Sequence, residues 1–330
     1  MPYNEFLKTL SEDDFKKKII SRTLCTEPNR ANCAKLLSIV RQELVLRLPK
    51  RAGETNPLIF GMSYNSARDE LFLADRYNGV VRSVRVRDNA GYLRDVYRAP
   101  HLGEWVWSVC HMNDSDTLLV CEGYLIQDTN WLVALSRNGS EWREAHRVQT
   151  DAVGMISCAL SDSRVLIGCG YLMYKYMELF RVESSLESGP RIARVHRIHV
   201  PELYCSFSAT CGSDTLVAIC YPFVLSDHSV RVHRLRGDRL EELARIQLKY
   251  PREILWLADR LLVADFYFRW NGWGGWNAVI ELEVSNTRLE RRRELIAASE
   301  NIYVISLCAV NDGVAIFDYN TRDILHYSFA

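Results

Sequence analysis

The residues best suited to binding chemistry in this sequence are aromatic side chains that recur at fixed spacing. The stretch "FYFRWNGWGGWNAV" (266–279) holds six aromatic rings and three glycines. Further tyrosines end short apolar runs elsewhere: Tyr77, Tyr124, Tyr171, Tyr267 and Tyr319, with Tyr221 one place early. Tyr, Trp and Met are enriched where proteins bind partners. We therefore predict these ligand-binding residues: Trp105, Tyr124, Tyr171, Tyr174, Tyr221, Phe223, Tyr267, Phe268, Trp270, Trp273 and Trp276. The alternative is that the recurring tyrosines pack between neighbouring repeats.

Carboxylates and serines also recur, and their regularity argues against catalysis. An aspartate at the end of a strand commonly caps the following turn. Small residues that recur in one strand suit close packing. The sequence has no G-x-S-x-G or H-E-x-x-H motif. We therefore favour a non-enzymatic protein with no catalytic residue. The carboxylates are Asp75, Glu122, Asp265 and Asp318, and the serines are Ser63, Ser108, Ser157, Ser208 and Ser306.

The elements that must position these residues form an internal repeat. A short apolar strand recurs six times at intervals of 45 to 52 residues, in the segments 71–77, 118–124, 165–171, 216–222, 261–267 and 313–319. A strand with small residues precedes each copy, and a strand with period-two alternation follows it. A more polar fourth strand closes all units but the last. Four strands in about 45 to 50 residues are typical of a propeller blade.

This repeat predicts an all-β protein, a six-bladed β-propeller of four-stranded antiparallel blades. The chain stops after the third strand of the last unit, so we expect the segment "ELVLRLP" (43–49) to close the ring as its fourth strand. The apolar spacing in residues 1–42 predicts a short N-terminal helical segment. The propeller is then 43–330, with blades near 57–100, 104–150, 153–201, 204–251, 252–299 and 301–330.

One blade carries a family resemblance. The stretch "GMSYNSARDELFLADRYNGVVRSVRV" (61–86) resembles an NHL-type repeat and is similar to blades of calcium-dependent lactonases and strictosidine-synthase-like (TolB-like) propellers. The first resemblance implies a binding or scaffold module that recognises a peptide or protein segment through an aromatic-rich face. The second implies an alternative, a lactonase-like or other hydrolytic enzyme with a central divalent cation. Its Ca²⁺ ligands would come from the four recurring carboxylates.

Composition narrows the partners and the compartment. Lys+Arg and Asp+Glu are balanced at 41 each, which argues against a nucleic-acid partner. A protein or peptide is the predicted partner, with carbohydrate as the alternative. No apolar run reaches the roughly 18 residues of a membrane span, and the N-terminus lacks a secretory signal. The ten cysteines, several of them inside apolar runs, form no CxxC pair. We therefore expect reduced core thiols, no cofactor and a cytoplasmic or nuclear location.

Overall fold

The computed structural model describes most of the chain beyond residue 38. It divides the chain into two units, Met1–Leu37 and Ser38–Ala330. All described residues belong to the second unit. They are residues 39–49, 51–86, 93–100, 105–123, 130–151, 156–160, 163–168, 176–185, 189–221, 227–257, 259–266, 277–285, 288–297, 302–311 and 313–329.

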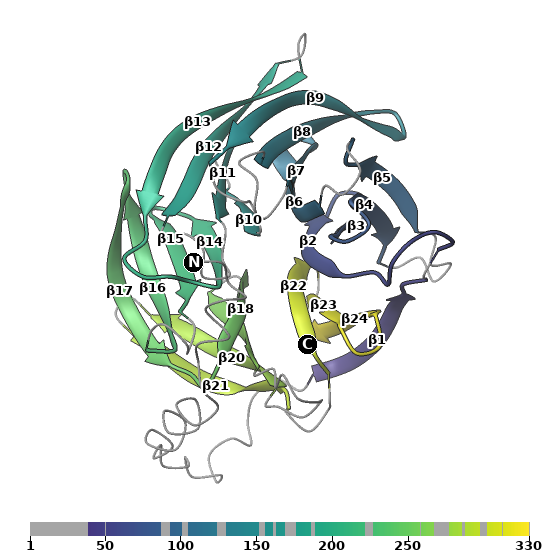
Figure 1. The fold of residues 1–330 in the computed structure, drawn as a ribbon. Helices are drawn as coiled ribbons and strands as arrows, with labels where there is room; N and C mark the ends of the chain where they lie inside the picture. Colours follow the sequence, from purple (N-terminus) through teal and green to yellow (C-terminus); the bar gives the residue numbers. More distant parts are fainter. Residues whose placement is uncertain are drawn as a thin grey trace, which may run out of the picture. The chain divides into compact units, whose positions relative to one another are not determined.

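The second unit is a ring of six four-stranded antiparallel sheets, which confirms the predicted six-bladed propeller (Figure 1). In blades one to five, each sheet runs from an inner strand to an outer one in chain order. Blade one is β2 (Ile59–Asn65), β3 (Glu70–Asp75), β4 (Val80–Arg85) and β5 (Arg94–Arg98), and blade two is β6 (Trp105–Met112), β7 (Thr117–Gly123), β8 (Asn130–Asn138) and β9 (Glu141–Thr150). Blade three is β10 (Ile156–Ala159), β11 (Arg164–Gly168), β12 (Tyr176–Ser185) and β13 (Gly189–His199). Blade four is β14 (Ser206–Cys211), β15 (Thr215–Cys220), β16 (Ser229–Arg236) and β17 (Arg239–Gln247). Blade five is β18 (Pro251–Leu257), β19 (Arg260–Phe266), β20 (Asn277–Ser285) and β21 (Arg288–Ile296).

Blade six takes its outer strand from the N-terminal side of the propeller. It consists of β22 (Val304–Val310), β23 (Gly313–Asp318), β24 (Asp323–Phe329) and β1 (Ile39–Arg47). Purple β1 lies antiparallel beside yellow β24, with Ile39 opposite Phe329 and Arg47 opposite Asp323 (Figure 1). The Arg47 guanidinium donates to both Asp323 carboxylate oxygens, at 3.0 and 3.2 Å.

The predicted N-terminal helical segment is not supported. Residues 39–42, which we expected to end that segment, belong to β1 because they supply the hydrogen bonds that β24 would otherwise lack. The rest of the segment, residues 1–38, lies outside the described residues. Within the described ranges the only helical element is the 3-10 turn Asn113–Ser115.

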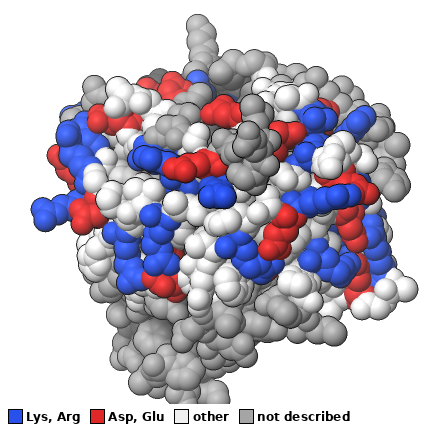
Figure 2. Space-filling model, turned by 90° about the horizontal axis from the view of Figure 1, so that it is seen from above, with Lys and Arg blue, Asp and Glu red and all other residues white. Residues whose placement is uncertain are grey.

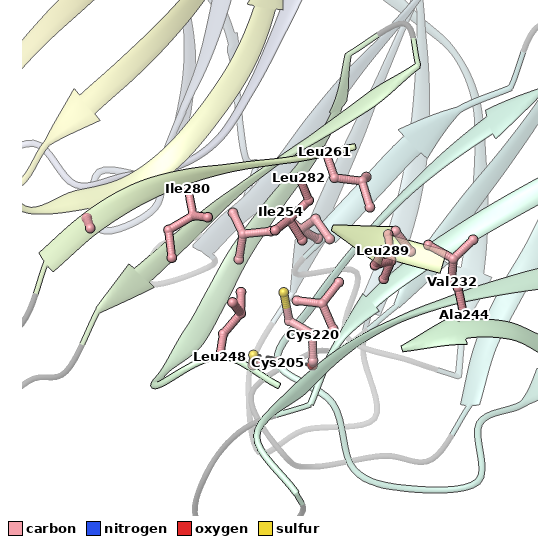
Figure 3. Close-up of a cluster of buried hydrophobic side chains, with 14 residues drawn as sticks. Cys205, Cys220, Val232, Ala244, Leu248, Ile254, Leu261, Ile280, Leu282 and Leu289 are labelled. Atoms are coloured by element: carbon pink, nitrogen blue, oxygen red, sulfur yellow. Dashed lines mark hydrogen bonds between the residues drawn. The ribbon is translucent and has the colours of Figure 1, made fainter. Parts of the chain in front are cut away.

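The core lies between the blades. Each of the six clusters of buried side chains joins two neighbouring blades, and Figure 3 shows the one between blades four and five. The second strand of a blade supplies both of its faces to such clusters. In β3, Leu71 and Leu73 pack toward blade six, whereas Phe72 and Ala74 pack toward blade two, and all four are fully buried. This two-sided burial explains the continuous apolar runs of the repeat.

The recurring small residues of the inner strands join each blade to the next. The Ser63 hydroxyl accepts a hydrogen bond from the backbone N–H of His111 at 2.8 Å, and the Ser208 hydroxyl accepts one from Trp256 at 2.9 Å. Two of these serines therefore have the packing role that their recurrence indicates. The seven described cysteines are free thiols, all buried or half-buried: Cys110, Cys121, Cys158, Cys205, Cys211, Cys220 and Cys308.

Ring closure gives a first prediction. Removal of residues 1–47 deletes β1, exposes the edge of β24 and takes Val45 and Leu46 out of the core. We expect a loss of roughly 3 kcal/mol or more in unfolding free energy, together with aggregation through the open edge. Urea unfolding and light scattering would measure both. A variant that lacks only residues 1–38 keeps β1 and serves as the control. Equal stability of the two truncated proteins would contradict this role of β1.

Candidate functional site

Three of the four recurring carboxylates form a hydrogen bond that links two strands of their own blade. At the end of the second strand of a blade, each accepts a hydrogen bond from the backbone N–H just before the first strand of the same blade. Asp75 accepts from Leu58 at 3.2 Å and Asp318 from Tyr303 at 2.9 Å, and Asp265 accepts from Tyr250 in the same way. Asp318 also caps the turn that follows it, since it accepts from Asn320 N–H at 3.0 Å.

Two of the four recurring carboxylates, Asp75 and Glu122, form ion pairs with arginine. Arg82, which is fully buried, lies 2.8 Å from Asp75, and Arg147 forms an ion pair with Glu122. The Tyr97 hydroxyl donates to Glu122 at 2.7 Å, and burial together with this carboxylate raises the pKa of Tyr97. Each of these four carboxylates has a hydrogen-bond or ion-pair partner within its own blade. Among the described residues, no group of three or more His, Cys, Asp or Glu is placed to hold a metal ion.

An arginine surrounded by aromatic rings lies where blades one and two meet. The Arg76 guanidinium carbon lies 4.1 Å from the ring centroid of Trp107, 4.4 Å from that of Trp105, 4.6 Å from that of Phe60 and 5.2 Å from that of Tyr77. We call these five residues the Arg76 cluster. Cation–π contacts of this kind are worth about 0.5 to 2 kcal/mol each, with the larger values at desolvated sites.

The rings of the cluster also pack against one another. Trp105 and Trp107 are edge to face at 5.1 Å, and Tyr77 contacts Trp105 at 6.0 Å. Trp107 is fully buried and donates its indole N–H to the carbonyl oxygen of Gly123. Tyr77 is 48% exposed and is the only large hydrophobic side chain exposed within the described residues. The cluster therefore has a rigid base and one accessible ring.

β-Bulges orient two of these rings. The pairing register shifts between Ile59 and Gly61 in β2 and between Val106 and Ser108 in β6, so Phe60 and Trp107 are the extra residues. A bulge turns its extra side chain away from the regular alternation of the strand. The two bulges lie in neighbouring blades. Arg76 lies in the loop after β3, and the two bulge rings pack against its guanidinium.

The predicted site residues fall into three groups. Trp105 is half-buried in the Arg76 cluster. Tyr221 is fully buried, with the Arg231 guanidinium 4.1 Å from its ring and its hydroxyl 3.3 Å from His233 Nε2. Tyr221 thus agrees with the alternative of packing within the propeller. The others lie outside the described residues: Tyr124, Tyr171, Tyr174, Phe223, Tyr267, Phe268, Trp270, Trp273 and Trp276.

The central channel is the second candidate site. A cavity of about 390 Å³ is lined by the inner strands of all six blades. Its one described lining carboxyl group is Glu253 of β18, which accepts a hydrogen bond from the Ser206 hydroxyl at 3.0 Å. Burial raises the pKa of Glu253 to about 8, so this side chain is mostly protonated at neutral pH.

Comparison with solved structures identifies the fold and no family. No family model matches the chain, and no curated protein sequence matches it. The major allergen Mala s 1 of Malassezia sympodialis superposes with a TM-score of 0.58 at 7% identity, over 88% of this chain and 96% of the allergen. The WD40 repeats of RRP9 give 0.56 at 8% identity, over 90% and 99%. A chain of the mitotic checkpoint complex gives 0.56 at 7% identity, over 93% and 99%.

At these identities the likeness concerns the propeller fold alone. The NHL-like and lactonase-like resemblances therefore stay predictions. The described residues include no helix with the length and apolar character needed to cross a membrane.

Sequence reasoning named Tyr77 and Trp105 of the Arg76 cluster but missed its other members and Glu253. Phe60, Arg76 and Trp107 appeared to be ordinary strand and turn residues, because the bulges that orient the rings cannot be recognised without the pairing register. The sequence does single out Glu253, because a glutamate stands where other inner strands have a small residue. Where β18 has this glutamate, the equivalent positions of β2, β6 and β22 hold Gly61, Ser108 and Ser306.

The raised pKa of Glu253 predicts a change of stability with pH. The folded state holds the proton up to about pH 8, whereas the unfolded chain releases it near 4.5. The contribution of Glu253 to wild-type stability should therefore fall as pH rises from about 4.5 to 8 and then level off. We expect Glu253→Gln to remove this fall and to be more stable than wild type at pH 9, by roughly 1–3 kcal/mol.

Urea unfolding of both proteins at pH 5 and pH 9 would measure this effect. Burial lowers the pKa of the His233 imidazole to about 4, below its ordinary value of 6.5, so His233 adds a rise of stability with pH to both proteins, and this rise cancels in the comparison between them. An equal pH dependence of the two proteins would show that Glu253 ionises freely in the folded state.

Proposed function

We propose that this protein is a non-catalytic binding module that recognises a peptide or protein segment through the face of the propeller that carries the Arg76 cluster. The observation that carries the proposal is the exposure of Tyr77 above a base of Arg76, Trp105 and Trp107. Tyr, Trp and Arg are the residues that most often dominate the binding energy of interfaces. A ring held by its neighbours loses little conformational entropy when a partner binds.

The contacts within the cluster favour a peptide. The guanidinium is already covered by four rings, so the cluster is not an empty aromatic cage for a cationic ligand. It presents instead the half-exposed Tyr77 ring beside edge-to-face tryptophan rings, which suits an extended segment with apolar side chains. Residues 267–276 of the aromatic stretch, which we also predict to bind the partner, lie outside the described residues.

The propeller neighbours are compatible with this proposal. They include a chain of a mitotic checkpoint complex and the WD40 repeats of RRP9. This support rests on the fold alone. The hydrolytic alternative is less well supported, because Asp75 and Glu122 already form ion pairs with Arg82 and Arg147.

A displayed library of random peptides would test the proposal. We expect Tyr77→Ala to weaken the selected peptides by at least about tenfold, since one central aromatic residue contributes about 2 kcal/mol or more. The thermal unfolding midpoint should barely change, because Tyr77 is half exposed. Tyr77→Phe should keep most of the affinity. Trp105 fluorescence should respond to peptide binding in the wild-type protein.

The control for this experiment is Arg239→Ala, which changes a side chain that is 90% exposed at the start of β17. It should bind the peptides as wild type does. Selected peptides that bind Tyr77→Ala as tightly as wild type would overturn the assignment of this face. Selection of glycans in place of peptides on an array would favour the carbohydrate alternative.

A further inference from the structure

A second cavity lies between blades three and four. It is at the ends where the second strands of the blades begin, whereas Arg76 follows the end of such a strand. The cavity has a volume of about 320 Å³ and is lined by Arg164, Leu179, Arg181, Val195, His196, Leu235 and Gly237. Three of these residues can carry positive charge and three are aliphatic. None of the described lining residues is acidic. The cavity therefore combines a basic end with an apolar wall.

Strand pairing brings the basic groups together. Arg164 in β11 lies directly opposite Arg181 in β12, and His196 in β13 lies opposite Leu179, two residues from Arg181 along β12. Like charges at directly opposed positions destabilise a sheet. An arrangement of this kind calls for a compensating negative charge.

At the equivalent positions of two other blades, residues of opposite charge face each other, although Glu70 and Arg260 form their ion pairs with Arg137 and Glu281. The first residue of the second strand is Glu70 opposite Arg85 in blade one, and Arg260 opposite Glu283 in blade five. Blade three alone of these three has two arginines. The cross-strand neighbour of Arg181 therefore supplies no counter-charge to it.

No side chain in the described ranges supplies it to Arg181 or His196. Neither side chain forms a hydrogen bond or an ion pair. The nearby acids of blade four are engaged, since Asp214 pairs with Arg234 and Glu241 with Arg236. Glu183, two residues beyond Arg181 in β12, is exposed and forms no ion pair with it. Arg164 donates to the Thr215 hydroxyl at 3.2 Å, which holds one guanidinium in place.

We propose that this cavity binds the phosphate group of an organic phosphate monoester. Guanidinium groups match phosphate oxygens through paired N–H donors, and two of them with an imidazole suit a dianion. Leu179, Val195 and Leu235 offer an apolar surface to the organic part of the ligand. A free small organic phosphate and a phosphorylated side chain share this chemistry. The site lies away from the Arg76 cluster and does not depend on the proposed function.

The experiment is isothermal titration calorimetry of the full-length protein with three probes: inorganic phosphate, O-phosphoserine and a neutral peptide with one phosphoserine. The unphosphorylated peptide is the matched blank. We expect saturable binding of the two esters, weakened by added salt. Tighter binding of the peptide would assign the ligand to a phosphorylated partner, and equal or tighter binding of O-phosphoserine would assign it to a small molecule.

The decisive variant is Arg181→Glu, which repeats in blade three the charge pair of blade five. We expect it to bind the esters at least about tenfold more weakly, while its unfolding midpoint stays the same or rises because the repulsion with Arg164 is gone. Arg288→Glu makes the same change of net charge on an exposed residue of blade five and should bind as wild type does. His196→Gln, at an exposed position, should weaken binding less.

Two results would overturn the proposal. One is the absence of saturable binding of both esters to the wild-type protein. The other is equal binding by wild type and Arg181→Glu. Should Arg181→Glu fail to fold, His196→Gln decides in its place, and unchanged ester binding by that variant would likewise overturn the site.

Discussion

The structure depends on the burial of the second strand of every blade on both of its faces. Leu71, Phe72, Leu73 and Ala74 of β3 show this, since alternate side chains enter the cores on either side of blade one. A strand buried in this way needs a neighbour on each side, and only a closed ring provides that for every blade. The pairing of β1 with β24 completes blade six, so that the edge of β24 is not left unpaired. The burial pattern and the ring closure therefore depend on each other.

Charges buried by this arrangement have to be neutralised inside it. Asp75 with Arg82, Glu122 with Arg147 and Glu281 with Arg293 are such pairs, and each joins strands of one blade. On the face shown in Figure 2, basic and acidic side chains also lie side by side. The recurring charges thus serve the fold. The candidate sites are built around three other residues, Arg76, Arg181 and Glu253.

The two proposed sites differ in how they hold their charge. Aromatic rings cover the Arg76 guanidinium and leave Tyr77 as the exposed contact, which suits a surface that buries apolar area. Arg181 is exposed beside a second arginine and a histidine, which suits an anion. Glu253 is a third case, a carboxyl group kept neutral by burial in the channel. Each environment follows from a single departure from the repeat.

The sequence by itself determined the number of blades, their four-strand pattern and the position of the closing strand to within a few residues. It could do so because apolar alternation reports local burial, and burial repeats with the blade. Only the tertiary structure decided that Phe60 and Trp107 flank Arg76, that Tyr221 is internal and that Arg164, Arg181 and His196 share a cavity. Those outcomes depend on bulges, on cross-strand register and on contacts between neighbouring blades. Such contacts join residues far apart in the chain, and no local pattern records them.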